Sequence, residues 1–286
     1  MSVATSTARP SRLRSVLRHA VLIVAAFGML YPLLWMVGSS FKPEQLIFSD
    51  PGLIPSEWDW SNYASGWNAL RVSFTTFYTN SFIIAGLAVI GNLIACSLTA
   101  YAFARLEFRF KWFWFALMLG TLMLPYHVTL VPQYVLFLNL GWVNSFLPLV
   151  VPKFLAVDAF FIFLMVQFFR GIPREIDEAA IMDGCGPWRI YWRIMLPLSL
   201  PVLATAAIFS FIWTYDDFLP PLIYLNDMRQ YTVPLALRAF IDSSGGESLY
   251  GEMFAMSVLS LVPVFIVFLA FQRLIIRGVT VGALKR

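Results

Sequence analysis

Long stretches without a single charged residue are the feature that most constrains how this chain can fold. Five of them contain no Asp, Glu, Lys or Arg, and they span residues 19–41, 72–104, 112–152, 194–215 and 253–272. A helix needs about 20 consecutive apolar residues to cross the hydrocarbon core of a bilayer. Charged residues make up 13% of the chain, against roughly 25% in a soluble domain. The sequence therefore predicts an all-α integral membrane protein.

The apolar stretches predict six transmembrane helices. The stretch that starts at Trp112 is long enough for one span and the start of another, which residues 154–169 complete. The expected helices cover residues 20–40, 77–103, 112–137, 145–169, 198–225 and 254–276. Apolar length alone leaves open whether the third is one helix or a pair kinked near Pro125 and Pro132.

Basic residues gather in alternate loops, and this pattern predicts the orientation of the chain, because cytoplasmic loops carry an excess of Lys and Arg. The clusters are Arg9, Arg12, Arg14 and Arg18; Arg105, Arg109 and Lys111; Arg170, Arg174, Arg189 and Arg193; and Arg273, Arg277, Lys285 and Arg286. Both termini are therefore expected in the cytoplasm, with residues 1–18 and 277–286 flanking a membrane domain of residues 19–276. We expect lipid contacts and no nucleic-acid partner, since no basic patch lies on a soluble domain.

The longest polar interruption on the predicted cytoplasmic side, residues 170–197, is organised as two short helices. The first is expected to begin at Pro173, and acidic residues follow in its first turns, where the helix dipole favours negative charge. Gly184 can adopt the left-handed conformation that ends a helix. Pro187 begins a second helix, which we expect to stop before Pro197. The residues alone leave open whether this loop is a well-capped hairpin or a docking element.

The same loop carries a recognisable motif. It contains Glu178-Ala179-Ala180-x-x-Asp183-Gly184, followed by Ile194-x-Leu196-Pro197. This string resembles the EAA motif of the membrane subunits of bacterial ABC importers, although Cys185 stands where Ala is usual. The segment TYDDFLPPLIYL at 214–225 and the tail RGVTVGALKR at 277–286 are similar to carbohydrate permeases, in particular the second permease of the maltose-transporter type.

The resemblance implies a type I ABC importer permease in the bacterial cytoplasmic membrane, forming half of the path for a sugar, polyol or sugar phosphate. The implied partners are a second, homologous permease, two ABC ATPase subunits and an extracytoplasmic solute-binding protein. The implied ATPase-coupling residues are Glu178, Ala179, Ala180, Asp183, Gly184, Leu196 and Pro197. The tail at 282–286 would also reach the ATPases.

No covalent chemistry is expected of this chain, so it is not expected to be an enzyme. It contains no GxxxxGK[ST] phosphate loop, and ATP and Mg²⁺ are therefore expected to bind the partner ATPases; no cofactor is assigned to this chain. His19 and His127 are too far apart to suggest a zinc site. Cys96 and Cys185 fall in a span and in the loop, which suggests neither a disulfide nor a metal site.

Ionisable residues at membrane depth indicate where a solute could pass, because burying them is costly. Lys153 and Asp158 lie in the fourth predicted span, about 140° apart on a helical wheel. They are expected not to pair with each other, and each is expected to face a wet cavity or a partner subunit. Alternatively, the helix begins later and Lys153 extends to the outer surface. Asn80, Asn92 and His127 are lesser polar candidates.

A second group of candidates lies in the fifth predicted span, just before Pro220-Pro221. These are Trp213, Tyr215, Asp216 and Asp217. Carboxylates accept hydrogen bonds from sugar hydroxyls, and aromatic rings contact sugar C–H faces. The alternative is a hinge in which the acids satisfy backbone N–H groups freed by the prolines.

Two rival classes remain. An ion-coupled secondary transporter would show repeat symmetry and buried acids, and no repeat is visible. An ABC permease for a non-sugar solute would keep the 170–197 loop and change the lining of the path. The outer loop, residues 41–76, either lies on the outer membrane surface or contacts an outside partner.

Overall fold

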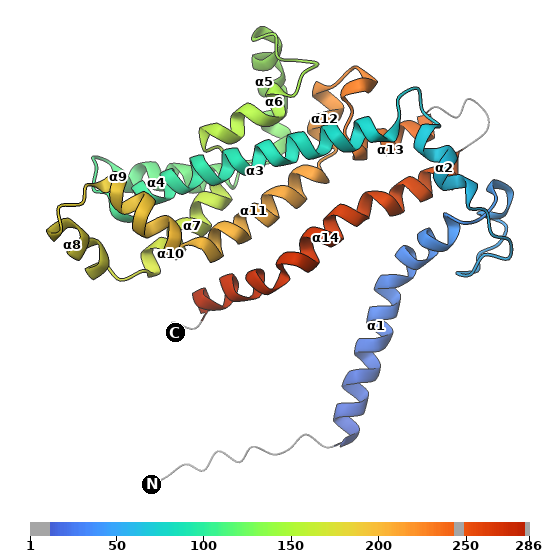
Figure 1. Cartoon of the computed structure of the whole chain (residues 1–286), viewed down its shortest axis with the longest axis horizontal. Coiled ribbons are helices and arrows are strands. Elements are labelled where there is room, and N and C mark those ends of the chain that lie inside the picture. Colours follow the sequence, from blue (N-terminus) through green and yellow to red (C-terminus); the bar gives the residue numbers. More distant parts are fainter. Residues whose placement is uncertain (1–11, 243–248, 284–286) are drawn as a thin grey trace.

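The computed structural model describes residues 12–242 and 249–283, and every regular element within these ranges is helical. The longest helices are α1 (Arg12–Ser39), α3 (Phe74–Arg105), α11 (Leu200–Tyr215) and α14 (Tyr250–Ala283). Helices α3, α11 and α14 run side by side, whereas α1 diverges from them (Figure 1). Only the C-terminal end of α1 comes close to α14 (Figure 1). The all-α fold is therefore confirmed for the described residues.

Shorter elements join these helices. They are η1 (Glu44–Leu46), α2 (Ser61–Asn68), α4 (Lys111–Thr121), α5 (Tyr126–Asn139), α6 (Leu147–Val150), η2 (Val151–Leu155), α7 (Ala159–Gly171), α8 (Glu175–Met182), α9 (Pro187–Ile190), η3 (Tyr191–Met195), α10 (Leu196–Leu198), α12 (Leu219–Tyr224), η4 (Met228–Gln230) and α13 (Val233–Asp242). Helices α8 and α9 lie at one end of the elongated molecule, and α2 and α13 lie at the other (Figure 1).

Four helical segments of the described chain are long and apolar enough to cross a membrane: Ser15–Ser39, Phe74–Arg105, Leu147–Gly171 and Tyr250–Gln272. The segments Pro187–Leu198 and Leu200–Tyr215 qualify together, with a bend of 76° between them. These segments correspond to the first, second, fourth, sixth and fifth predicted spans.

The third predicted span is interrupted. Residues 112–137 fall mainly in α4 and α5, which are separated by residues 122–125. Pro125 immediately precedes α5, while Pro132 lies inside that helix. The kinked pair near Pro125 is thus the arrangement observed. A proline lacks the N–H that would bond to the preceding turn, which accounts for the break.

Helix α3 is the centre of the packed core, where it contacts α7 and α11. Small side chains such as Ala88 and Ala100, both fully buried, let neighbouring helices approach closely. At Gly91 of α3 the approach is close, because a Cβ there would lie 2.8 Å from the Phe154 ring and 3.0 Å from the Lys153 backbone. The η2 segment is thereby pressed against α3.

Parts of the predicted termini lie outside the described residues. These are residues 1–11 of the predicted segment 1–18 and residues 284–286 of the predicted tail 277–286. The tail contact with ATPases therefore stays a prediction.

The outer loop contains a buried cation that the sequence did not single out. Lys42 is fully buried, and its Nζ donates to the carbonyl oxygens of Asp50 at 2.5 Å and Gly52 at 2.7 Å. The Asp50 carboxylate accepts the Gly52 N–H at 3.0 Å, and this hydrogen bond lowers the pKa of Asp50 below its usual value. The loop is therefore closed around Lys42.

The same loop is tied to the start of α14. The Glu44 carboxylate accepts the backbone N–H groups of Tyr250 at 3.1 Å and Gly251 at 2.9 Å. These are unpaired donors at a helix N-terminus, where a carboxylate is favoured. A side chain from the outer loop therefore fixes the beginning of the last span.

We expect Lys42→Met to destabilise the outer loop, because two carbonyl groups would lose their buried donor. The cost should be about 1–3 kcal/mol, measurable by thermal unfolding in detergent and by protease cleavage within residues 41–76. Arg71→Gln is the matched control, since Arg71 is exposed. Equal stability of the two variants would contradict this role of Lys42.

Candidate functional site

The first helix of the 170–197 loop ends as the sequence predicts. Helix α8 is followed by Asp183 and then Gly184, whose φ is +79°. The Gly184 N–H donates to Ile181 O and the Cys185 N–H to Ala180 O, both at 2.9 Å. A left-handed glycine with such bonds satisfies the last carbonyls of the helix, so the chain reverses sharply after α8.

The second helix of the loop runs further than predicted. It was expected to stop before Pro197, but α9 continues through a π-helical turn, η3, into α10, which contains Pro197. Pro197 directly follows the π-helical turn η3 and lies within α10, so this proline does not end the helix. The 76° bend falls instead at Ser199, between α10 and α11.

An ion pair fixes the loop to the body of the protein. Arg105, the last residue of α3, places its Nε 3.0 Å from Asp177 Oδ2 in α8, with side-chain exposures of only 5% and 15%. The Arg105 Nη2 also donates to Ile172 O at 2.7 Å. Breaking one partner of a buried ion pair leaves the other charge without compensation, so α8 is held firmly against α3.

Tyrosines hold the second helix of the loop in the same way. Tyr101 donates its hydroxyl to Pro187 O at 3.1 Å, and its ring lies 5.3 Å from that of Tyr191. The Tyr191 hydroxyl is 2.7 Å from Ser97 Oγ. Both helices of the loop are thus anchored on the last three turns of α3.

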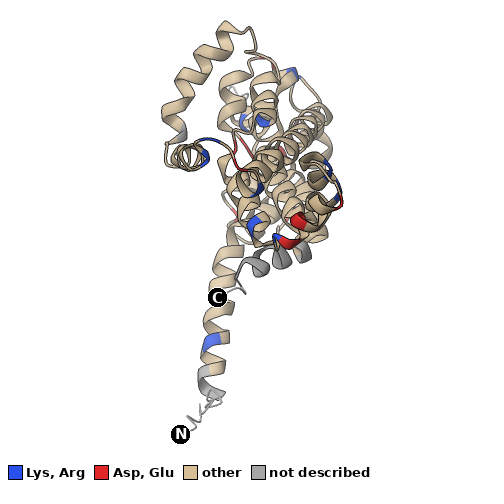
Figure 2. Cartoon of the chain, turned by 90° about the vertical axis from the view of Figure 1, so that its left-hand side faces the viewer, with Lys and Arg blue, Asp and Glu red and all other residues tan. Residues whose placement is uncertain are grey.

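The opposite face of α8 is exposed and carries most of the motif. Glu178, Ala179, Asp183 and Gly184 are exposed, whereas Ala180 is buried against the body. The Glu178 carboxylate forms no hydrogen bond or ion pair with any described residue. Around it Ile181 and Met182 are 60% and 87% exposed. Figure 2 views this end, and the long helices behind it are almost free of acidic and basic residues.

The other two motif residues lie beyond the exposed face of α8. Leu196 is partly buried, and it packs against the same core cluster as Ala180, while Pro197 is exposed. The motif therefore has an exposed part on α8 and a part that joins the loop to the bend.

We expect Arg105→Gln to loosen the loop, because Asp177 would keep a buried charge without its partner. The local cost should be on the order of 3 kcal/mol and should appear as faster amide hydrogen exchange in α8. Arg189→Gln, which alters an exposed arginine of the same loop, should leave exchange unchanged. Slow exchange in both variants would contradict the anchoring role.

A cavity of about 670 Å³ lies between α5, the α6–η2–α7 segment and the α11–α12 junction. Lys153 and Asp158 both line it. They also pair with each other, since Lys153 Nζ lies 2.9 Å from Asp158 Oδ2 and 3.2 Å from Oδ1. The expectation that these two residues would not pair is therefore wrong.

The pair forms because the helix is broken between the two residues. Lys153 lies in η2, Ala156 has a φ of +56°, and α7 begins only at Ala159. The angle of about 140° assumed one continuous helix, and the break removes that constraint. We refer to this space, with its ion pair, as the charged cavity.

The charged cavity includes two of the four candidates from the fifth predicted span. Trp213 and Asp217 line it, and the Trp213 ring lies 5.2 Å from that of Phe160 and 5.4 Å from that of Phe161. Tyr215 is buried in packing against Phe211 and Phe82 instead.

Asp216 is exposed and is not part of the cavity lining. The helix ends at Tyr215, so neighbouring residues beyond it point in different directions. The four candidates are thus divided between the cavity and other environments.

Uncharged polar residues complete the cavity, and the sequence indicated only some of them. Asn92 lines it and donates to Ser210 Oγ at 2.9 Å. Gln133 and Thr214 also line it and were missed, although both are polar residues within apolar stretches. Asn80 is structural, since it donates to the carbonyl oxygens of the Arg229–Tyr231 segment.

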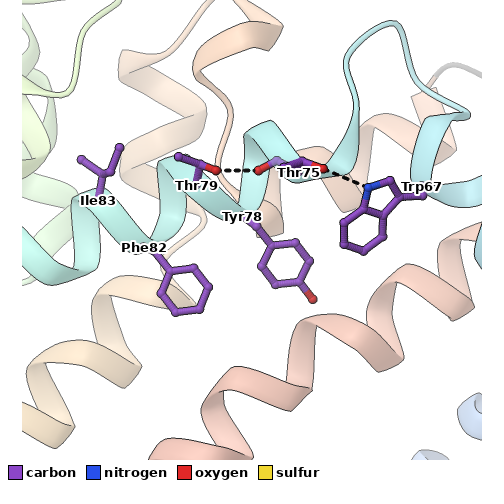
Figure 3. A pocket seen from close by; sticks show the side chains of 6 residues that line it. All are labelled: Trp67, Thr75, Tyr78, Thr79, Phe82 and Ile83. Carbon is purple, nitrogen blue, oxygen red and sulfur yellow. Dashed lines mark hydrogen bonds between the residues drawn. The ribbon is translucent and has the colours of Figure 1, made fainter.

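A second, shallower hollow of about 530 Å³ lies over the outer half of α3 (Figure 3). The Trp67, Tyr78 and Phe82 rings point to the same side of α3, with neighbouring centroids 5.8 Å and 6.2 Å apart. Trp67 Nε1 donates to Thr75 Oγ1 at 3.0 Å. No charged residue lines this hollow, so it differs in kind from the charged cavity.

The helical arrangement and the apolar segments are those of a multi-pass membrane protein. Residues 2–281 match the family described as "Binding-protein-dependent transport system inner membrane component". The chain belongs to this family. Its location in the membrane as a multi-pass protein follows from that membership.

Similar proteins support the assignment. The chain is 31% identical to the diacetylchitobiose uptake system permease protein NgcG of Streptomyces coelicolor, over 99% of this chain and 93% of that protein. It is 33% identical to the trehalose/maltose transport system permease protein MalG of Thermococcus litoralis, over 94% and 98%. A crystal structure of a bacterial ABC transporter for the acidic polysaccharide alginate has a TM-score of 0.81 and 22% identity, covering 93% and 98% of the two chains.

Proposed function

We propose that this chain is the permease subunit of an ATP-driven ABC importer for a sugar, polyol or sugar phosphate, and that it forms half of the translocation path. The observation that carries the proposal is the 170–197 loop, because its motif face is exposed while its other face is fixed to α3. Such a loop is suited to receive a partner on one side and pass on its movement to the spans on the other. The named solutes of NgcG and MalG, both saccharides, favour a carbohydrate.

The proposed partners follow from this role. Two ATPase subunits would bind and hydrolyse ATP with Mg²⁺, since this sequence has no phosphate loop. Glu178 would meet a basic group of one ATPase, and Ile181 and Met182 would enter an apolar part of its surface. A second, homologous permease would complete the path, and an extracytoplasmic binding protein would deliver the solute. The charged cavity, with Lys153, Asp158, Trp213 and Asp217, would line this half of the path.

Movement would pass through two routes. The Arg105–Asp177 ion pair connects α8 to α3, and the α9–η3–α10 segment leads directly into α11 through the bend at Ser199. Helices α3 and α11 pack against each other and both supply residues to the charged cavity. A displacement of α8 therefore changes the position of the helices that line the path.

We expect Glu178→Lys to abolish ATP-dependent uptake and to weaken co-purification with the ATPases, because a positive charge would face a basic partner group. A like-charge contact across an interface costs several kcal/mol. Glu175→Lys, three residues earlier in the same helix, is the charge-matched control. Undisturbed assembly and uptake in Glu178→Lys would contradict the docking role.

The rival class is tested by the purified chain without partners. In proteoliposomes it should move no sugar in response to a proton or sodium gradient, and uptake should appear only with the ATPases, the second permease and ATP. Gradient-driven flux through the chain alone would favour an ion-coupled transporter.

A further inference from the structure

The charged cavity has an uneven balance of charge. Among the described residues that line it, Lys153 is the one cation, and Asp158 and Asp217 are the two carboxylates. If the cavity is part of the solute path, as the proposed function holds, this balance acts on any solute that enters. The fold does not decide whether the solute is neutral or anionic. The similar alginate importer is named for an acidic polysaccharide, and MalG is named for trehalose and maltose.

The Lys153 ammonium is already committed. It contacts both carboxylate oxygens of Asp158, at 2.9 Å and 3.2 Å, and the side chains of the pair are 27% and 25% exposed. An ammonium has three donors, and these contacts take up two of them. To bind an anionic solute, Lys153 would have to leave Asp158 as an uncompensated charge in the cavity, which is costly.

Asp217 lies on the same cavity and forms no ion pair with any described residue. The charge of Lys153 also acts on Asp217, but over a longer distance than on Asp158. Near it stand the Trp213 and Phe160 rings, whose faces carry partial negative charge and attract cations rather than anions. The remaining polar groups, such as Gln133 and Asn92, are uncharged and suited to hydroxyl groups.

We infer that this half of the path selects uncharged hydroxylated solutes, such as neutral saccharides or polyols, against anionic ones such as sugar phosphates and uronic acids. Asp217 makes the electrostatic potential in the charged cavity negative. Lys153, the only cation among the described residues that line the cavity, is paired with Asp158 and therefore does not make this potential positive. This narrows the solute class that sequence and family leave open.

The field can be measured without knowing the solute. A single cysteine is introduced as Thr214→Cys, which lines the cavity, in a chain carrying Cys96→Ala and Cys185→Ala. Its reaction rates with methanethiosulfonate reagents bearing an ammonium or a sulfonate group are compared in the assembled importer, each relative to a free thiol. A cleft of one sign raises the local concentration of counter-ions by tenfold or more, so the ammonium reagent should react at least about tenfold faster.

Three isosteric or near-isosteric substitutions should change the ammonium-to-sulfonate ratio of reaction rates, two of them downwards and one upwards. Asp217→Asn should lower the ammonium-to-sulfonate ratio several-fold, and Asp158→Asn, which frees Lys153, should lower it as well. Lys153→Gln should raise it. The control is the chain that retains Cys185 as its only cysteine, in which Asp217→Asn should leave the ratio unchanged. A ratio at or below one in the parent, or no response to Asp217→Asn, would overturn the inference.

Uptake then tests the solute class. The assembled importer is offered a neutral disaccharide and the corresponding uronate or phosphate, with ATP. Faster uptake of the neutral compound is expected, and equal or faster uptake of the anion would overturn the selectivity. Absence of any ATP-dependent uptake, with the reagent ratio as expected, would count against the proposed function and not against the charge of the cavity.

Discussion

The contact between Arg105 and Asp177 is the interaction on which the rest of the account depends. It joins the end of α3 to the first helix of the 170–197 loop at a distance of 3.0 Å, with both side chains largely shielded from water. Without it, α8 would lose its direct link to α3, and only the route through α9, η3 and α10 would connect the loop to the spans. With it, α8 and α3 form one mechanical unit, and α3 is the helix around which α7 and α11 pack.

The end of α3 next to the loop and the middle of α3 serve different tasks. At the loop end, Tyr101 and Arg105 anchor both helices of the loop. At mid-length, Gly91 admits the broken segment of the fourth span, and Asn92 reaches the charged cavity. A single rigid helix of 32 residues therefore links the surface that would receive a partner to the space that would hold a solute.

Much of this organisation could be predicted from local sequence signals. The apolar stretches predicted five of the six spans, and the third is interrupted between α4 and α5. Gly184 predicted the end of α8, because a left-handed glycine is a local requirement. The relation between Lys153 and Asp158 could not be predicted, since it depends on a helix break in a segment that packs against Gly91 of a distant helix. The buried Lys42 was missed for the same reason, because its acceptors are carbonyl groups placed by a folded loop rather than by side-chain identity. The prediction that the second helix of the loop stops before Pro197 was wrong, because the helix continues through a π-helical turn that accommodates this proline.

The central claim is that the loop and the charged cavity move together when ATP binds to the partners. It is tested most directly by the distance between spin labels at Met182, which is 87% exposed on α8, and at Leu155, which is 70% exposed beside the cavity. In the assembled importer, with Cys96 and Cys185 replaced by alanine, a non-hydrolysable ATP analogue should leave this distance unchanged, because α8 and the helices beside the cavity move as one unit, and Arg105→Gln should make the distance change with nucleotide. A distance that changes with nucleotide in the parent, or one that stays constant in Arg105→Gln, would contradict the account.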